Sequence, residues 1–308
     1  MKKFILLFLA TFLLYNLCHA QCLNVSLSSN RASNNSVEIR ATVKGYGSYT
    51  AFVKFSRLEN ATCENEITIP ILGSGTVYTM RPLNPQKPII YGYTYRIVRG
   101  LVDPKVKTDF VYRLPYSTTK TTRVKSLGNF SEKHFGGSNT ENWHSYQFIL
   151  EKGDTVFAAR KGIVVQITDE HDTQDLGGEI SMSSKQNQVL VEHADGSIAR
   201  YGVLEKENIF VKEGETVYPN TPVGLAGSYD GIVYQLRFSV FYRTKNKSSN
   251  PKFENSPTST AYIEPIFATT NGNTTLNPKE RHTPVINNEI LTKEFSKKEL
   301  KKWEKKTF

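Results

Sequence analysis

The sequence contains two similar stretches, Lys152-Gly153-Asp154-Thr155-Val156-Phe157 and Glu213-Gly214-Glu215-Thr216-Val217-Tyr218, which have the same or similar residue types in the same order. Each copy is a turn that leads into Thr, Val and an aromatic residue. A glycine-containing apolar stretch follows each copy, residues 162–165 after the first and residues 223–227 after the second. This repetition predicts two similar β-hairpins that face each other in a flattened β-barrel.

The preceding stretch, residues 21–112, has the pattern of short β-strands. Residues 37–43 alternate apolar and polar side chains, Gly45-Tyr46-Gly47 marks a turn, and residues 49–55 alternate again, which predicts a β-hairpin. Prolines separate further short apolar runs at residues 67–72, 77–80, 91–98 and 110–113. Strands at this spacing predict a small β-sandwich, so we expect the fold to be all-β.

The first 20 residues have the features of a secretory signal peptide. Lys2 and Lys3 give a positive start, residues 4–15 are apolar, and Ala20 is the small residue expected before a cleavage site. An apolar run of this length is too short to span a bilayer comfortably. We therefore expect an exported protein that is periplasmic, cell-surface or secreted.

Export would place the cysteines that remain after cleavage, out of three in the sequence, in an oxidising compartment. Cys18 would leave with the signal peptide, and Cys22 and Cys63 would stay. Two thiols in an oxidising compartment most simply form one disulfide, which would tie the new N-terminus to its own domain. Two cysteines alone do not make a zinc site.

Several segments between residues 112 and 238 resemble the motifs of a known protein family and follow one another in the same order. They are Gly153-Asp154-Thr155-Val156-Phe157, Val189-Leu190-Val191-Glu192-His193-Ala194-Asp195-Gly196, Val211-Lys212-Glu213-Gly214 and Leu236-Arg237-Phe238. In these segments the chain resembles the lysostaphin- and LytM-type zinc endopeptidases of peptidase family M23. The resemblance implies a LytM-like flattened β-barrel, a barrel-sandwich hybrid, over residues 113–278. It also implies an enzyme that cuts peptide cross-links in peptidoglycan.

The zinc site that this resemblance implies is degenerate in the chain. The family's zinc-binding Asp corresponds to Gln147, its His-Leu-His triplet to Gln235-Leu236-Arg237, and the assisting His of its Tyr-Ala-His-Leu strand to Val203. A guanidinium group cannot bind a metal, because it stays protonated. A catalytic zinc site needs three protein ligands and an open position for water.

The family's first zinc-binding His has no certain counterpart. Relatives with a Phe-Ser-His motif align it with Glu132, while His134 is two residues away and His144 lies nearer the strand of Gln147. An active enzyme would have to use displaced ligands among these residues and His193, and would then need zinc. His193 itself sits at an Asp-Gly turn, where a structural role is favoured. We expect no catalytic residue, no metal site and no cofactor.

A groove that has lost its metal can still bind a ligand. Amide, phenol and guanidinium groups hydrogen-bond peptide carbonyls and carboxylates without hydrolysing them. We expect a non-catalytic protein of the cell envelope that binds peptidoglycan peptides or regulates a cell-wall hydrolase. The alternatives are a zinc metalloendopeptidase with displaced ligands and a purely structural secreted or surface protein. The candidate groove residues are Glu132, His134, His144, Gln147, Tyr201, Val203, Tyr234, Gln235 and Arg237.

The formal net charge of +10 is unevenly distributed along the 308 residues. Residues 113–278 hold 17 basic and 18 acidic residues, whereas residues 279–308 hold 9 and 5, a net +4. Ser296-Lys297-Lys298-Glu299 is a capping-box pattern, which predicts a short basic helix at the end of a flexible tail. Such a tail suits an anionic envelope surface, and export argues against nucleic acid as the partner.

Overall fold

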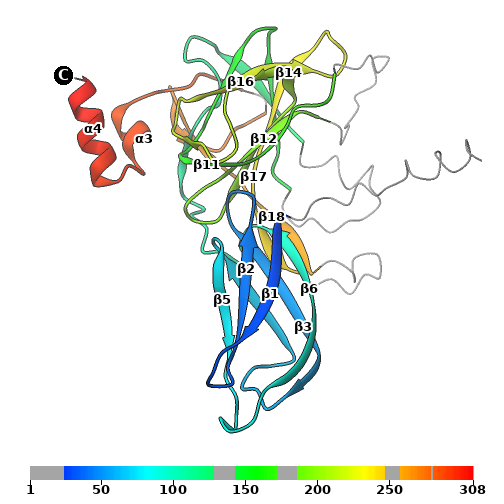
Figure 1. The fold of residues 1–308 in the computed structure, drawn as a ribbon. Helices are drawn as coiled ribbons and strands as arrows, with labels where there is room; N and C mark the ends of the chain where they lie inside the picture. The colour runs from blue at the N-terminus through cyan, green and yellow to red at the C-terminus, as the bar shows by residue number, and fades with distance from the viewer. Residues whose placement is uncertain (1–23, 128–142, 173–185, 247–256, 279, 308) are drawn as a thin grey trace, which may run out of the picture.

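The computed structural model describes residues 24–127, 143–172, 186–246, 257–278 and 280–307. Nearly all regular structure within these ranges is β-strand, so the predicted all-β class is confirmed. Figure 1 shows an elongated body built from the N-terminal strands and a second β body beyond it, with helices α3 and α4 at the side of the second body.

Two three-stranded sheets form the N-terminal body, in the orders β1-β2-β5 and β4-β3-β6. A single buried core lies between the two sheets. One sheet contributes Val37, Ile39 and Ala41 to it, and the other contributes Ala51 and Val53. The predicted small β-sandwich is therefore confirmed. Its strands are β1 (Val25–Arg31), β2 (Val37–Val43), β3 (Tyr49–Glu59), β4 (Glu66–Ile71), β5 (Gly75–Met80) and β6 (Ile90–Arg99).

The predicted hairpin between β2 and β3 is wrong. β2 pairs with β1 and β5, whereas β3 pairs with β4 and β6, so the two strands lie in different sheets. The turn that contains Gly47, at φ +80°, carries the chain from one sheet to the other. Alternation of apolar and polar residues shows that one face of a strand is buried. It does not show whether the next strand lies beside it in the same sheet or opposite it in the other sheet, because the same face is buried in both cases.

The second body is built on one branched sheet of twelve strands. Its main path runs β15-β11-β12-β13-β17-β9-β8-β21, and β10, β14, β16 and β18 attach to it. The bounds are β8 (Thr122–Ser126), β9 (Tyr146–Leu150), β10 (Thr155–Phe157), β11 (Gly162–Thr168), β12 (Gln188–Glu192), β13 (Ile198–Gly202), β14 (Leu204–Ile209), β15 (Thr216–Val217), β16 (Pro222–Ser228), β17 (Tyr234–Lys245), β18 (Thr258–Ile263) and β21 (Arg281–His282).

The two copies of the repeated turn pair reciprocally. β10, which ends the first copy, pairs with β16, the strand that follows the second copy. β15, which ends the second copy, pairs with β11, the strand that follows the first copy. Each repeat thus pairs with the strand that follows the other copy. The predicted pair of similar β-hairpins is therefore wrong, because β10 does not pair with β11 and β15 does not pair with β16.

A small sheet of β7 (Val111–Arg113), β19 (Ile266–Thr269) and β20 (Gly272–Thr274) packs beside the large sheet. Phe267 of β19 contacts the rings of Tyr112, Phe148 and Phe238 at centroid distances of 6.2, 6.3 and 5.8 Å. Aromatic pairs at these distances add to the energy of apolar burial. The main core of the second body is therefore shared between the two sheets.

The C-terminal segment is bound to the second body, which corrects the expectation of a flexible tail. It contains α3 (Asn288–Thr292) and α4 (Lys297–Thr307). The capping box is confirmed, because the Ser296 N–H donates to Glu299 Oε2 at 2.6 Å and the Glu299 N–H donates to Ser296 Oγ at 3.3 Å. The described part of the chain holds no helix long and apolar enough to cross a membrane.

The two bodies meet at the turn that leads into β3. The backbone N–H of Ser48 donates to Glu192 of β12 at 2.9 Å, and the Ser48 hydroxyl donates to the other oxygen of the same carboxylate. Cys63 lies in the first body, but Cys22 lies outside the described residues, so the disulfide stays a prediction.

Candidate functional site

Three of the predicted groove residues converge on one face of the large sheet. Gln147 of β9 lies directly opposite Arg237 of β17, and Gln235 lies two residues before Arg237 on the same face. The Gln147 amide donates from Nε2 to Oε1 of Gln235 at 2.6 Å. The structure therefore brings together three of the residues that the sequence resemblance assigns to the family's zinc site.

Cationic side chains border Gln147 on both sides along this face. Lys125 of β8 is its cross-strand neighbour on one side, and Arg237 is its neighbour on the other. Arg237 is only 9% exposed, and its guanidinium carbon lies 4.9 Å from the centre of the Tyr229 ring. Burial lowers the pKa of Arg237, while Tyr229 acts in the opposite direction.

Tyr229 was not singled out from the sequence, although it belongs to this site. It lies in the turn between β16 and β17, and its hydroxyl donates to Oε1 of Gln186 at 2.9 Å. An added Cβ at Gly202, the residue opposite Arg237 on β13, would collide with the Gln186 side chain. Gln186 therefore lies against β13 and links Tyr229 to it.

Val203, which the sequence resemblance sets at the position of the family's assisting His, has an unusual backbone. Its φ is +63°, in the left-handed region that a β-branched residue rarely adopts. Such a conformation costs on the order of 1–3 kcal/mol and persists only where the surroundings impose it. Here the Val203 carbonyl accepts from the Gly227 N–H at 2.8 Å, and the side chain is 3% exposed.

Two of the predicted groove residues lie elsewhere. Tyr201 is fully buried in the core, where its hydroxyl accepts from the Ala159 N–H at 2.8 Å, so it does not line the groove. Tyr234 precedes Gln235 in β17, and strand alternation puts it on the face of Leu236 and Phe238. These two residues were predicted from their closeness in sequence to the motif residues, but neighbouring residues of a strand point to opposite faces of the sheet. They therefore do not share the face of Gln147, Gln235 and Arg237.

Of the candidates for the first zinc ligand, the structure describes His144. Glu132 and His134 lie outside the described residues. His144 is half-buried just before β9. Among the residues that the structure describes, no group of three or more His, Cys, Asp and Glu is placed to hold a metal ion. A guanidinium in a ligand position and a second cation beside Gln147 do not fit a divalent zinc ion.

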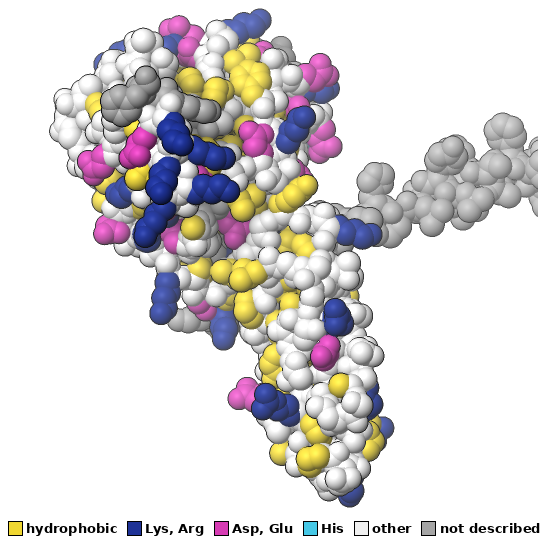
Figure 2. Space-filling view, turned by 60° about the vertical axis from the view of Figure 1, so that its left-hand side comes forward, with side chains coloured by type: hydrophobic (Ala, Val, Ile, Leu, Met, Phe, Trp, Pro, Cys, Tyr) yellow, Lys and Arg dark blue, Asp and Glu magenta, His cyan; other side chains and the backbone are white. Residues whose placement is uncertain are grey.

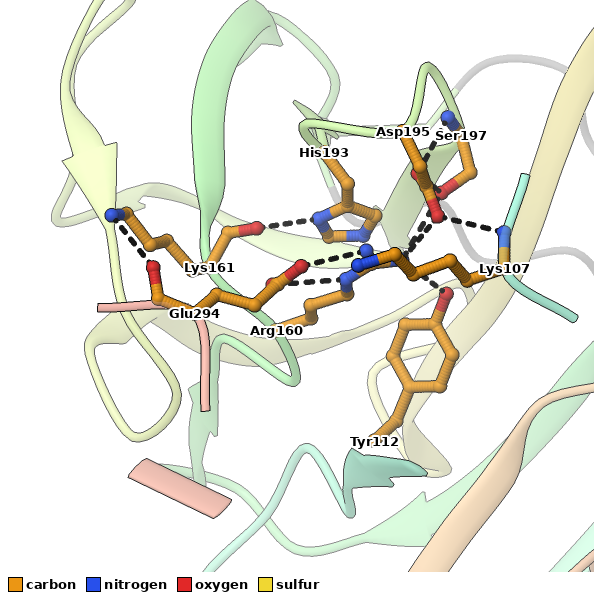
Figure 3. A network of polar contacts seen from close by, with 8 residues as sticks. All are labelled: Lys107, Tyr112, Arg160, Lys161, His193, Asp195, Ser197 and Glu294. Carbon is orange, nitrogen blue, oxygen red and sulfur yellow. Dashed lines mark hydrogen bonds and ion pairs between the residues drawn. The ribbon is translucent and has the colours of Figure 1, made fainter. Parts of the chain in front are cut away.

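A second polar cluster lies around Arg160, whose side chain has no exposure (Figure 3). Its guanidinium donates to Glu294 at 3.0 and 2.8 Å and to Asp195 at 2.9 Å, and its carbon lies 3.8 Å from the centre of the Phe110 ring. Burial opposes ionisation of Asp195, but hydrogen bonds from Ser197 and from a backbone N–H lower its pKa to about 2. This cluster attaches the C-terminal segment, through Glu294, to the hairpin tip at Asp195.

His193 belongs to the same cluster and serves the framework. Its Nδ1 lies 2.8 Å from the carbonyl oxygen of Lys161, so Nδ1 carries the proton, and its buried Nε2 has no hydrogen-bond partner among the described residues. Burial and the charge of Arg160 lower the pKa of His193 to about 3. The imidazole is therefore neutral at ordinary pH. It lies away from the β9–β17 face, on the hairpin between β12 and β13.

Residues 141–251 match peptidase family M23. The resemblance inferred from the sequence is thus confirmed for this segment, which lies within the second body. No curated protein matches the chain.

Several solved structures match the chain at low overall similarity. The M23 metalloprotease pseudoalterin is 17% identical, with a TM-score of 0.31, and the match covers 58% of this chain and 99% of that protein. A zinc-containing peptidase from Vibrio cholerae is 12% identical, with a TM-score of 0.29 over 71% of this chain and 75% of that protein. Helicobacter pylori Csd3 is 12% identical, with a TM-score of 0.30 over 83% of this chain and 72% of that protein.

Proposed function

We propose that this chain is an exported, non-catalytic relative of the M23 peptidases that binds peptides of peptidoglycan on the β9–β17 face. The observation that carries the proposal is the contact between Gln147 and Gln235 beside Arg237. These three side chains stand where the family resemblance implies zinc and its assisting His. They form a polar site that can hold a peptide without supplying a metal-bound nucleophile.

The chemistry of the three side chains suits a peptide ligand. An amide group offers two N–H donors and a carbonyl acceptor, which match the backbone of an extended peptide. A guanidinium adds charge-assisted, bidentate hydrogen bonds to a carboxylate. Because Gln147 and Gln235 already exchange one hydrogen bond, each keeps further donor or acceptor positions for a ligand.

Hydrolysis by the family mechanism is not supported by these residues. That mechanism requires a zinc ion with three protein ligands, which lowers the pKa of a bound water to about 7. Neither Gln147 nor Arg237 is a ligand that zinc favours, and Val203 has no group that could assist a water. A catalytic alternative would need displaced ligands, including residues outside the described ranges.

The first experiment measures metal and hydrolysis together. We expect the chain, purified without added metal, to contain far less than one zinc per molecule and to leave purified peptidoglycan uncut. Stoichiometric zinc together with cleavage that a chelator abolishes would overturn the proposal in favour of a zinc endopeptidase with displaced ligands.

The second experiment measures binding of soluble stem peptides released from peptidoglycan. It is run at about 1 M salt, where the Debye length is only about 3 Å and remote surface charges contribute little. We expect Arg237→Ala to weaken binding at least tenfold, because a charge-assisted hydrogen bond contributes about 1.5–3 kcal/mol. The matched control is Arg123→Ala, an exposed arginine on β8. Equal affinities of the two variants, or no binding by the unmodified chain, would contradict the proposal.

A further inference from the structure

The orientation of α4 is fixed by one acidic side chain. Lys161 Nζ lies 2.9 and 2.7 Å from the two carboxylate oxygens of Glu299, and the Tyr218 hydroxyl donates to the same carboxylate. These hydrogen bonds lower the pKa of Glu299. Phe295, just before the helix, meets the Tyr218 ring edge to face at a centroid distance of 5.2 Å. The side of α4 that carries Glu299 is therefore turned toward the second body.

The opposite side of α4 is made of lysines. An α-helix advances about 100° per residue, so five lysines fall within about 140° of one another and opposite Glu299 and Trp303. All five are exposed, and they line one shallow hollow of about 410 Å³. We call this set the lysine face, and its members are Lys297, Lys298, Lys301, Lys302 and Lys305.

The charge of the lysine face is not neutralised locally. Within the described part of the chain, no carboxylate forms an ion pair with any of its five members. The helix as a whole has six lysines and two glutamates, 6 − 2 = +4, and one of those glutamates, Glu299, is already bound to Lys161. Figure 2, which brings the side of the molecule with α4 forward, shows Lys and Arg side chains gathered there.

The geometry and chemistry of this face favour one kind of ligand. Lys297 and Lys305 are eight residues apart, about 12 Å along the helix axis, so the charges form a row and not a point. Lysine is a compact point charge with three donors, which suits phosphate oxygens, whereas planar bidentate recognition of carboxylates favours arginine, and α4 contains none. Leu300 and Trp303 lie on the other side of the helix, so the face lacks the apolar stripe by which helices enter membrane interfaces.

We propose that the lysine face binds a linear polymer of phosphate groups, laid along α4. The anchor through Glu299 holds the helix in place, so the five lysines already share one face before the ligand arrives, which reduces the entropy lost on binding. Because this surface is separate from Gln147, Gln235 and Arg237, the proposal does not depend on the proposed peptide site.

The test compares two variants that lose the same charge. The first replaces the lysine face: Lys297→Gln, Lys298→Gln, Lys301→Gln, Lys302→Gln and Lys305→Gln. Glutamine has nearly the helix propensity of lysine, so α4 is retained, and circular dichroism checks this. The matched control removes five scattered exposed lysines: Lys44→Gln, Lys87→Gln, Lys105→Gln, Lys152→Gln and Lys212→Gln.

The probe is inorganic polyphosphate, with affinity measured over a series of salt concentrations. We expect the first variant to lose at least tenfold in affinity at low salt, and its slope of log affinity against log salt to flatten by several units, because counterion release scales with the number of phosphate contacts. The control should lose less than threefold, and Arg237→Ala should leave polyphosphate binding unchanged.

Three results would overturn the proposal: equal losses in the two variants, no binding of polyphosphate by the unmodified chain, or binding only to vesicles of anionic phospholipid. Vesicles of phosphatidylglycerol with phosphatidylcholine are included for this last comparison. Retention by vesicles without binding to polyphosphate would assign the lysine face to a membrane surface.

Discussion

The ion pair between Arg160 and Glu294 is expected to be the main attachment of the C-terminal segment. Arg160 has no exposed side-chain surface, and Glu294 is 15% exposed. Glu294→Ala removes the acceptors of two guanidinium donors, at 3.0 and 2.8 Å, and one of the two carboxylates that neutralise Arg160. The other carboxylate, Asp195, remains at 2.9 Å.

The magnitude follows from this geometry. Removing one partner of a buried ion pair costs about 3–5 kcal/mol, because a charge is left buried without compensation. Since Asp195 still faces Arg160, we expect the lower end, about 3 kcal/mol of unfolding free energy. Glu294→Gln keeps one acceptor oxygen, and we expect it to cost about 1–2 kcal/mol.

Urea unfolding followed by tryptophan fluorescence measures this loss. The chain has two tryptophans, Trp143 beside the second body's strands and Trp303 in α4, so the signal comes from the region under test. The control is Glu304→Ala, an exposed residue of α4, with an expected change within about 0.5 kcal/mol. A loss below about 1 kcal/mol for Glu294→Ala, or an equal loss for Glu304→Ala, would refute the reasoning.

Three further predictions concern local features. The pKa of His193 is lowered to about 3, so below pH 6.5, the pKa of an unfolded histidine, the unfolded chain binds more protons than the folded chain. The free energy of unfolding therefore decreases as the pH is lowered, by at most about 1.4 kcal/mol per pH unit. Urea unfolding at pH 7 and pH 5 should show this decrease, and His193→Asn should remove it. Gly47→Ala, at φ +80° and against Glu192, should cost about 2–4 kcal/mol in urea unfolding, while Gly73→Ala, in open space, should cost under 1 kcal/mol. Ser296→Ala should cost α4 about 1 kcal/mol, seen as roughly fivefold faster amide hydrogen exchange in its first turn; unchanged exchange would count against the capping box.

Local patterns predicted most of the fold because each has a local physical cause. Alternation located strands such as β2 and β3, and the spacing of Ser296 and Glu299 located the start of α4. The pairing of strands is not local. The turn at Gly47 has the sequence of a hairpin, yet it connects two sheets, because the core between those sheets decides which strands pair.

The candidate site was predicted in part for the same reason. Correspondence with a family motif found Gln147, Gln235 and Arg237, because they lie on strands whose order the motif fixes. Tyr229 lies in a turn outside the motif, and Glu294, the partner of Arg160, lies 134 residues away and outside the segment that matches the family. Long-range partners of buried charges leave no periodic signal in a sequence.

The reciprocal pairing of the two repeats has a consequence for fragments of this domain. If the chain were divided between β13 and β14, each piece would contain a strand whose hydrogen-bonding partner had gone with the other piece. Such pieces would expose unpaired edges and would not fold separately, but complementary pieces mixed in solution would supply each other's missing strand. The domain is thus a candidate for split-protein complementation, in which folding reports that two fragments have met.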